Sequence, residues 1–138
     1  MFWFMRIRCV MERADISLEK ARAYISQLDL SYIVNAMCSP AYALPRWHHA
    51  EALHCLKLYK NFLWLQKKHF PEFLVPTREI DEFWHNHILY TKQYHADCAA
   101  IFGHYLHHAP VGPEENPQQL VDDYQKTRGY YFTEFGEN

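Results

Sequence analysis

The stretch TREIDEFWHNHILYTKQYHADCAAIFGHYLHHAP, residues 77–110, decides how the chain folds and where its chemistry lies. Six of the ten histidines fall within it, together with Cys98, one of the four cysteines. Its apolar residues recur at three- and four-residue steps, which is typical of amphipathic helices. We expect the rest of the chain to supply helices that pack around this histidine-rich stretch.

Two helices are predicted within the stretch. Thr77 can cap a helix over residues 78–89, and acidic residues in its first turns suit the positive end of the helix dipole. Thr91 can cap a second helix over residues 92–102, which Gly103 would end. A single bent helix is the alternative.

The same periodicity predicts further helices on both sides of this stretch, and no segment shows the sustained alternation that marks a strand. The further helices are expected over residues 15–29, 31–38, 46–69 and 117–128. The predicted fold class is therefore all-α, a compact single-domain bundle of about five to six helices. We expect residues 1–14 to form a disordered N-terminal extension, residues 15–138 to form one helical domain, and the aromatic tail 130–135 to dock on the core.

Composition excludes several classes of function. The net charge of −2 argues against nucleic-acid binding, which needs a basic surplus. No run reaches the roughly 20 apolar residues of a membrane span, and no signal-peptide core is present. The cysteines form no C-x-x-C pair, which favours reduced thiols in a cytoplasmic protein. With four glycines and no phosphate-binding motif, no nucleotide cofactor is expected.

The histidines allow two arrangements of a metal site. His85 and His87 point about 200° apart on a helix, so a regular helix cannot direct both at one ion. In the first arrangement, Asp81 orients His85 from four residues away, and a histidine from the following loop supplies a further ligand. In the second, His87 and Cys98 both point inward and His108 completes the thiolate and imidazole set that zinc prefers.

Structural roles compete with these assignments. A buried histidine such as His87 is more often hydrogen-bonded to a tyrosine hydroxyl or a backbone carbonyl than bound to metal. The Asp81–His85 pair is equally compatible with a purely structural contact, and Cys98 alone is more often plain core. The adjacent His107-His108 pair is the hardest to explain structurally, because it lies just before a proline.

Residues 81–110 resemble the glycine-rich domain-containing protein-like family, which is described as a domain of unknown function. The matching residues are Asp81, Trp84-His85, His87, Thr91, Tyr94, Asp97-Cys98, Phe102-Gly103, His107-His108 and Pro110. The resemblance implies that the histidine, cysteine and aspartate set forms a site, and it implies no reaction. Large plant members carry a glycine-rich C-terminal region that this chain lacks.

The leading prediction is a divalent-metal site of structural or regulatory role, with zinc as the first candidate. Its predicted ligands are His85, Cys98 and His108, with His87 as the alternate ligand and Asp81 as the orienting partner. The second hypothesis is a metal-dependent, hydrolase-like enzyme, which needs an open coordination position and a cleft. The third is a metal-free helical module that binds a protein partner through an aromatic patch at residues 130–135.

Overall fold

The structure is a computed structural model that describes residues 15–109 and 116–136. Within these residues it contains six helices and no strand, which confirms the predicted all-α class. The helices are α2 (Leu18–Gln27), α3 (Ser31–Cys38), α4 (His49–His69), α5 (Arg78–Leu89), α6 (Thr91–Phe102) and α7 (Pro117–Phe135). The predicted N-terminal extension, residues 1–14, lies outside the described residues. None of the six helices combines the length and the apolar character needed to cross a membrane.

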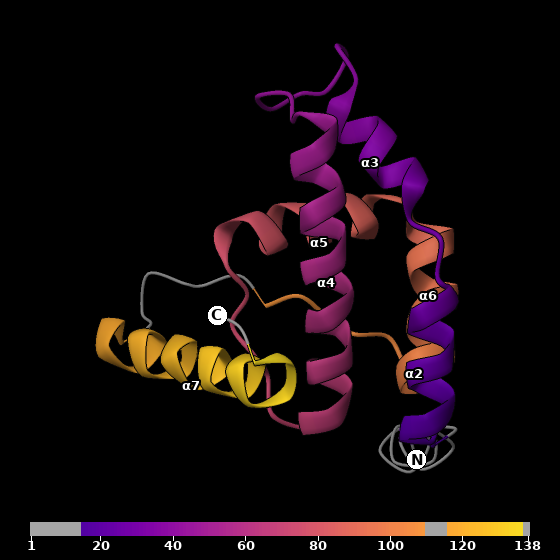
Figure 1. Ribbon diagram of the computed structural model, residues 1–138. Helices are drawn as coiled ribbons and strands as arrows, with labels where there is room; N and C mark the ends of the chain where they lie inside the picture. Colours follow the sequence, from indigo (N-terminus) through magenta and orange to yellow (C-terminus); the bar gives the residue numbers. More distant parts are fainter. Residues whose placement is uncertain (1–14, 110–115, 137–138) are drawn as a thin grey trace, which may run out of the picture.

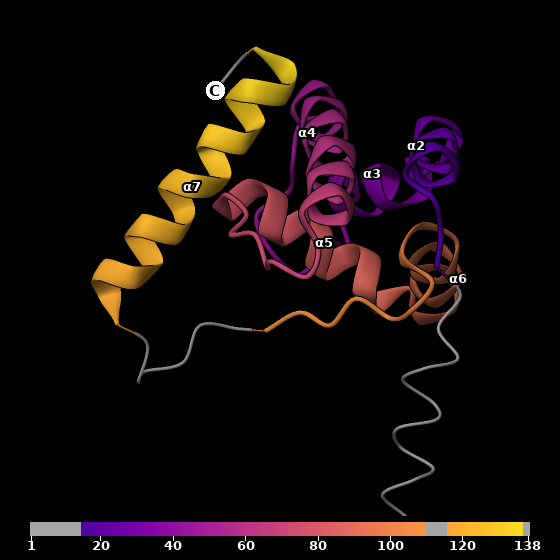
Figure 2. The ribbon, with the colours of Figure 1, turned by 90° about the horizontal axis from the view of Figure 1, so that it is seen from below.

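Helix α4 is the central element, and it contacts α2, α3, α5 and α7 (Figure 1). Helices α2 and α6 run side by side, and α5 crosses α4. Figure 2 shows α7 on the opposite side of α4 from α2 and α6. The core is strongly aromatic, with its largest fully buried side chains on α4, α5 and α6. Among these are Tyr59, Phe62, Phe83 and Tyr94.

The ends of the helices follow local chemistry in most places. Thr77 accepts a hydrogen bond from the backbone N–H of Ile80, and Gly103 ends α6 in the left-handed conformation at φ 74°. The break near Thr91 is present, so α5 and α6 are two helices and not one bent helix. However, the predicted cap at Thr91 is wrong, because Thr91 is already helical and the preceding Tyr90 makes no side-chain capping bond.

Helices α2 and α4 each begin three residues later than the sequence predicts. Ser17 caps α2 by accepting from the backbone N–H of Lys20, so this helix begins at residue 18 and not at 15. Helix α4 begins at residue 49 and not at 46. Here the backbone N–H of Trp47 donates to the carbonyl of Met37, which holds the preceding residues in a non-helical path.

The largest difference is at α7, which continues through Gly129 and ends at Gly136, where φ is 71°. A glycine inside a helix costs about 1 kcal/mol relative to alanine, which contacts of the last turns offset. Among these, Glu134 accepts hydrogen bonds from Nε1 of Trp64 and from Lys68. The aromatic tail therefore packs as helix, with Tyr130, Tyr131 and Phe135 against the core and Phe132 exposed.

Candidate metal site

Asp81 and His85 lie one helical turn apart on α5, at the edge of its buried face. Ile80 and Trp84 are about 5% exposed and pack into the core on that face, as the periodicity predicts. Asp81 and His85 therefore lie at the boundary between core and solvent. A spacing of four residues places both side chains on the same side of the helix.

His108 reaches α5 from the segment that follows α6. Leu106 is 1% exposed, and its carbonyl accepts a hydrogen bond of 2.5 Å from the Tyr94 hydroxyl. The same hydroxyl accepts a hydrogen bond of 2.9 Å from Nε1 of Trp84. Trp84 on α5 and Tyr94 on α6 thus hold the segment in place at Leu106, two residues before His108. The Trp84 ring also lies beside the His108 ring, with the ring centroids 4.3 Å apart.

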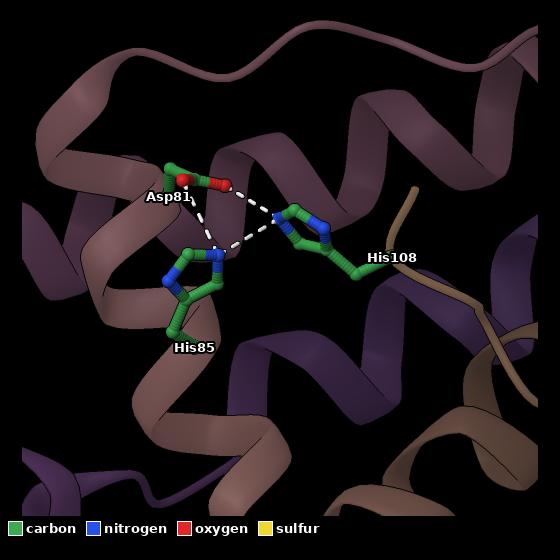
Figure 3. Close-up of side chains that lie close together, drawn as sticks. All are labelled: Asp81, His85 and His108. Carbon is green, nitrogen blue, oxygen red and sulfur yellow. Dashed lines mark hydrogen bonds and ion pairs between the residues drawn. The ribbon is translucent and has the colours of Figure 1, made fainter. Parts of the chain in front are cut away.

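The polar ends of Asp81, His85 and His108 meet at one point (Figure 3). Nε2 of His108 lies 2.6 Å from Oδ1 of Asp81. Nε2 of His85 lies 3.3 Å from Oδ2 of the same carboxylate, and the two Nε2 atoms are 3.1 Å apart. One carboxylate and two imidazoles therefore present their donor atoms to a shared space.

These separations are close to those of ligands around a small divalent ion. Ligands about 2.0–2.1 Å from a tetrahedral zinc ion lie about 3.3 Å from one another. The 3.1 Å between the two imidazole nitrogens matches this value, and each nitrogen lies within 3.3 Å of one oxygen of the Asp81 carboxylate. Two histidines and one carboxylate suit zinc, and they are also the ligand set of non-haem iron(II) sites. Without an ion, the contacts of His85 and His108 with Asp81 are hydrogen bonds from imidazole N–H groups to the carboxylate.

The cluster is open to solvent on the side of His85. The exposed fractions of the side chains are 53% for His85, 33% for Asp81 and 17% for His108. A surface pocket of about 470 Å³ adjoins the cluster, and Asp81 and His85 form part of its lining. Three protein ligands leave at least one position of a tetrahedral ion for water or another ligand.

Comparison with known proteins identifies the family of the chain. Residues 20–127 match the family described as UCP032817-like, and this range includes all five residues singled out as metal ligands or as their orienting partner. The chain belongs to the UCP032817-like family. The expected resemblance to the glycine-rich domain-containing protein-like family is therefore wrong, because it rests on residues 81–110 alone. No curated protein and no solved structure matches the chain.

His87, the predicted alternate ligand, lies in the core of this UCP032817-like fold and away from the cluster. Its Nε2 is 2.8 Å from Oδ2 of Asp97, and its Nδ1 is 2.7 Å from the Tyr59 hydroxyl. Oδ1 of Asp97 accepts a hydrogen bond of 2.6 Å from the Tyr24 hydroxyl. A neutral His87 that donates to Asp97 and accepts from Tyr59 satisfies both of its nitrogens. This chain of hydrogen bonds joins α2, α4, α5 and α6, so the structural role of His87 is the one that the geometry supports.

Burial keeps the two tyrosines of this network protonated. It raises the pKa of Tyr59 well above its ordinary value. Burial, together with the hydrogen bond to Asp97, raises the pKa of Tyr24 to about 12. Both hydroxyls therefore remain hydrogen-bond donors at neutral pH, and the network is a structural feature of the core.

Cys98, predicted as a ligand, also lies away from the cluster. It is 2% exposed, and its thiol lies beside the Tyr94 hydroxyl and the Leu106 backbone. Burial raises the pKa of this thiol, which disfavours the thiolate that a metal would need. The predicted combination of Cys98 with His85 and His108 is therefore not formed. Periodicity correctly places Cys98 on the inward face of α6, where its thiol lies beside the Tyr94 hydroxyl and not at the cluster.

The geometry changes the role expected of Asp81 and adds two residues that the sequence analysis missed. Asp81 is predicted only to orient His85, whereas its carboxylate contacts both imidazoles directly. Trp84 and Tyr94 position the segment of His108, and no spacing in the sequence indicates their mutual hydrogen bond. The four-residue spacing of Asp81 from His85, from which the orienting role is predicted, is equally compatible with a role as ligand.

Proposed function

We propose that Asp81, His85 and His108 bind one divalent cation, with zinc as the first candidate. The observation that carries this proposal is the convergence of three donor atoms from two segments of the chain. Nitrogen and oxygen donors of this kind are the usual ligands of zinc and related ions. The metal assignment remains a prediction, and the structure supports it through the positions of these atoms.

The cation would have a structural or regulatory role, because it would connect α5 to the segment after α6. Asp81 and His85 lie on α5, whereas His108 lies 23 residues beyond His85. An ion that binds only the folded chain stabilises it by about 2.7 kcal/mol at a free concentration one hundred times its dissociation constant. Removal of the metal with a chelator is expected to lower the melting temperature and to loosen the segment that carries His108.

Elemental analysis of protein purified without a histidine tag tests the proposal. The parent protein is expected to hold about one equivalent of zinc or iron, as one three-ligand site requires. His85→Ala and His108→Ala are expected to lose it, whereas Cys98→Ala, which removes a thiol outside the cluster, is expected to retain it. Metal-free parent protein that takes up no added zinc would overturn the proposal.

A second candidate function is metal-dependent hydrolysis. The observation that favours it is the solvent-open cluster beside the pocket, because an ion with a free position can activate a water molecule. The test is the rate at which zinc-loaded protein hydrolyses p-nitrophenyl acetate and p-nitrophenyl phosphate. Equal rates for the parent protein and for His108→Ala would reject this candidate.

A further inference from the structure

We propose that the pocket beside the cluster binds a small organic oxyanion, a carboxylate or a phosphate, through the cation and Arg78. One oxygen of the ligand would occupy the open coordination position, and its apolar part would lie against the wall of the pocket. This inference rests on the proposed metal site. The pocket is lined by Leu44, Pro45, Trp47, Arg78, Glu79, Asp81, Glu82 and His85.

One face of α5 brings Arg78 and the cluster together. Arg78, Asp81, Glu82 and His85 follow one another at the helical steps i, i+3, i+4 and i+7, so their side chains share a face. The rise of about 1.5 Å per residue places Arg78 about 4.5 Å along the axis from Asp81 and about 10.5 Å from His85. An oxyanion of a few heavy atoms can therefore contact both an ion at the cluster and the guanidinium, which matches carboxylates and phosphates through paired N–H groups.

The wall opposite α5 is rigidly held. The carboxylate of Glu82 accepts hydrogen bonds from Nε1 of Trp47 at 2.9 Å and from the Tyr42 hydroxyl at 3.0 Å. The backbone N–H of Trp47 donates to the carbonyl of Met37 at 3.0 Å. These bonds fix the indole in the lining, which also includes Leu44, a residue that is 54% exposed. The pocket therefore combines a polar floor on α5 with an apolar wall suited to a hydrocarbon or aromatic group.

Charge makes the predicted binding dependent on the metal. The lining carries one arginine against the carboxylates of Glu79, Asp81 and Glu82. Without a cation the surplus of negative charge would repel an anion, whereas a divalent ion would balance the lining. The volume of about 470 Å³ lies within the usual range for small-molecule sites. A small anion with one apolar group, bound only by the metal-loaded protein, fits these properties.

Cobalt(II) provides a direct test, because its visible spectrum changes when its ligands change. Protein loaded with one equivalent of cobalt is titrated with inorganic phosphate, acetate and phenylacetate. We expect a saturable spectral change with phosphate or with the carboxylates. Whichever of these two classes of anion binds more tightly identifies the head group of the ligand. Phenylacetate is expected to bind more tightly than acetate, and Leu44→Ser is expected to reduce that difference.

Arg78→Gln is the decisive variant, and Arg128→Gln on α7 is its matched control. Arg78→Gln is expected to bind cobalt normally and to weaken anion binding about ten- to hundredfold, the effect of losing hydrogen bonds to a charged group. Arg128→Gln is expected to behave as the parent protein. Cobalt binding with no anion-dependent spectral change, or unchanged anion affinity in Arg78→Gln, would overturn this inference and leave the metal site intact. Failure to bind cobalt at all would overturn both.

Discussion

Replacing Tyr94 by phenylalanine tests how the fold holds His108 at the cluster. The Tyr94 hydroxyl accepts from Nε1 of Trp84 and donates to the carbonyl of Leu106, and all three residues are at most 5% exposed. The substitution leaves a buried N–H and a buried carbonyl without these partners. Each unpaired buried group costs about 1–3 kcal/mol, so we expect the free energy of unfolding to fall by about 2–4 kcal/mol.

The assay is thermal unfolding followed by circular dichroism, without metal and with added zinc. The expected loss corresponds to a melting temperature lower by about 6–15 °C for a chain of this size. The variant should also bind zinc about ten- to hundredfold more weakly, because the segment that carries His108 loses its anchor. Tyr130→Phe is the matched control, since the Tyr130 hydroxyl donates to the partly exposed Glu72, and it should change stability by less than about 0.5 kcal/mol. Equal losses in the two variants, or unchanged zinc affinity in Tyr94→Phe, would refute the reasoning.

Three further predictions concern the core and α7. Asp97→Asn should lower the free energy of unfolding by about 2–3 kcal/mol in urea titrations, because Tyr24 and His87 donate to different carboxylate oxygens and the amide NH2 that replaces one of them cannot accept a hydrogen bond. Lys68 and Trp64 lower the pKa of Glu134 below its ordinary value of 4.5. The contribution of ionised Glu134 to the free energy of unfolding is therefore fully present above pH 4.5 and is lost as the pH falls through the lower pKa of the folded state. Glu134→Gln should therefore flatten the dependence of melting temperature on pH between about 6 and 3. Burial raises the pKa values of Cys55 and Cys98. Both thiols should therefore resist alkylation in native protein at neutral pH, as mass spectrometry of peptides would show.

Each of these predictions has a result that would contradict it. The control for Asp97→Asn is Asp122→Asn, on the exposed face of α7, which should leave the free energy of unfolding within about 0.5 kcal/mol of the parent value. If Asp97→Asn loses no more stability than Asp122→Asn, the buried network is contradicted. For Glu134, the contradicting result is a pH profile that the glutamine variant leaves unchanged. For the thiols, it is alkylation of Cys98 as fast in native protein as in protein unfolded by urea.

Local chemistry made most of the fold predictable from the sequence. Thr77 and Gly103 act within a few residues of the helix ends that they mark, so their effect is visible without the tertiary structure. The exception is Gly129, because glycine is a residue type that often ends helices and here it lies inside α7. The contacts that carry the helix past it come from α4, and no local signal reveals them.

The candidate site was predictable only in part, for the same reason. Helical periodicity shows that His87 and Cys98 point inward and that Asp81 and His85 share an edge. It does not show which residues lie opposite. The partner of His87 is Asp97, ten residues away, and the position of His108 depends on a buried hydrogen bond from Tyr94. The choice of Cys98 as a ligand follows from residue chemistry, and only the packing of α6 shows that its thiol lies elsewhere.

The central claim is tested most directly by X-ray crystallography of protein crystals soaked in zinc, with data collected at the zinc absorption edge. The account predicts one anomalous peak about 2.0–2.2 Å from a carboxylate oxygen of Asp81 and from Nε2 of both His85 and His108. The peak should be absent from crystals of His108→Ala treated in the same way. A peak at His87 or Cys98, or no peak at any zinc concentration that leaves the crystals intact, would contradict the account.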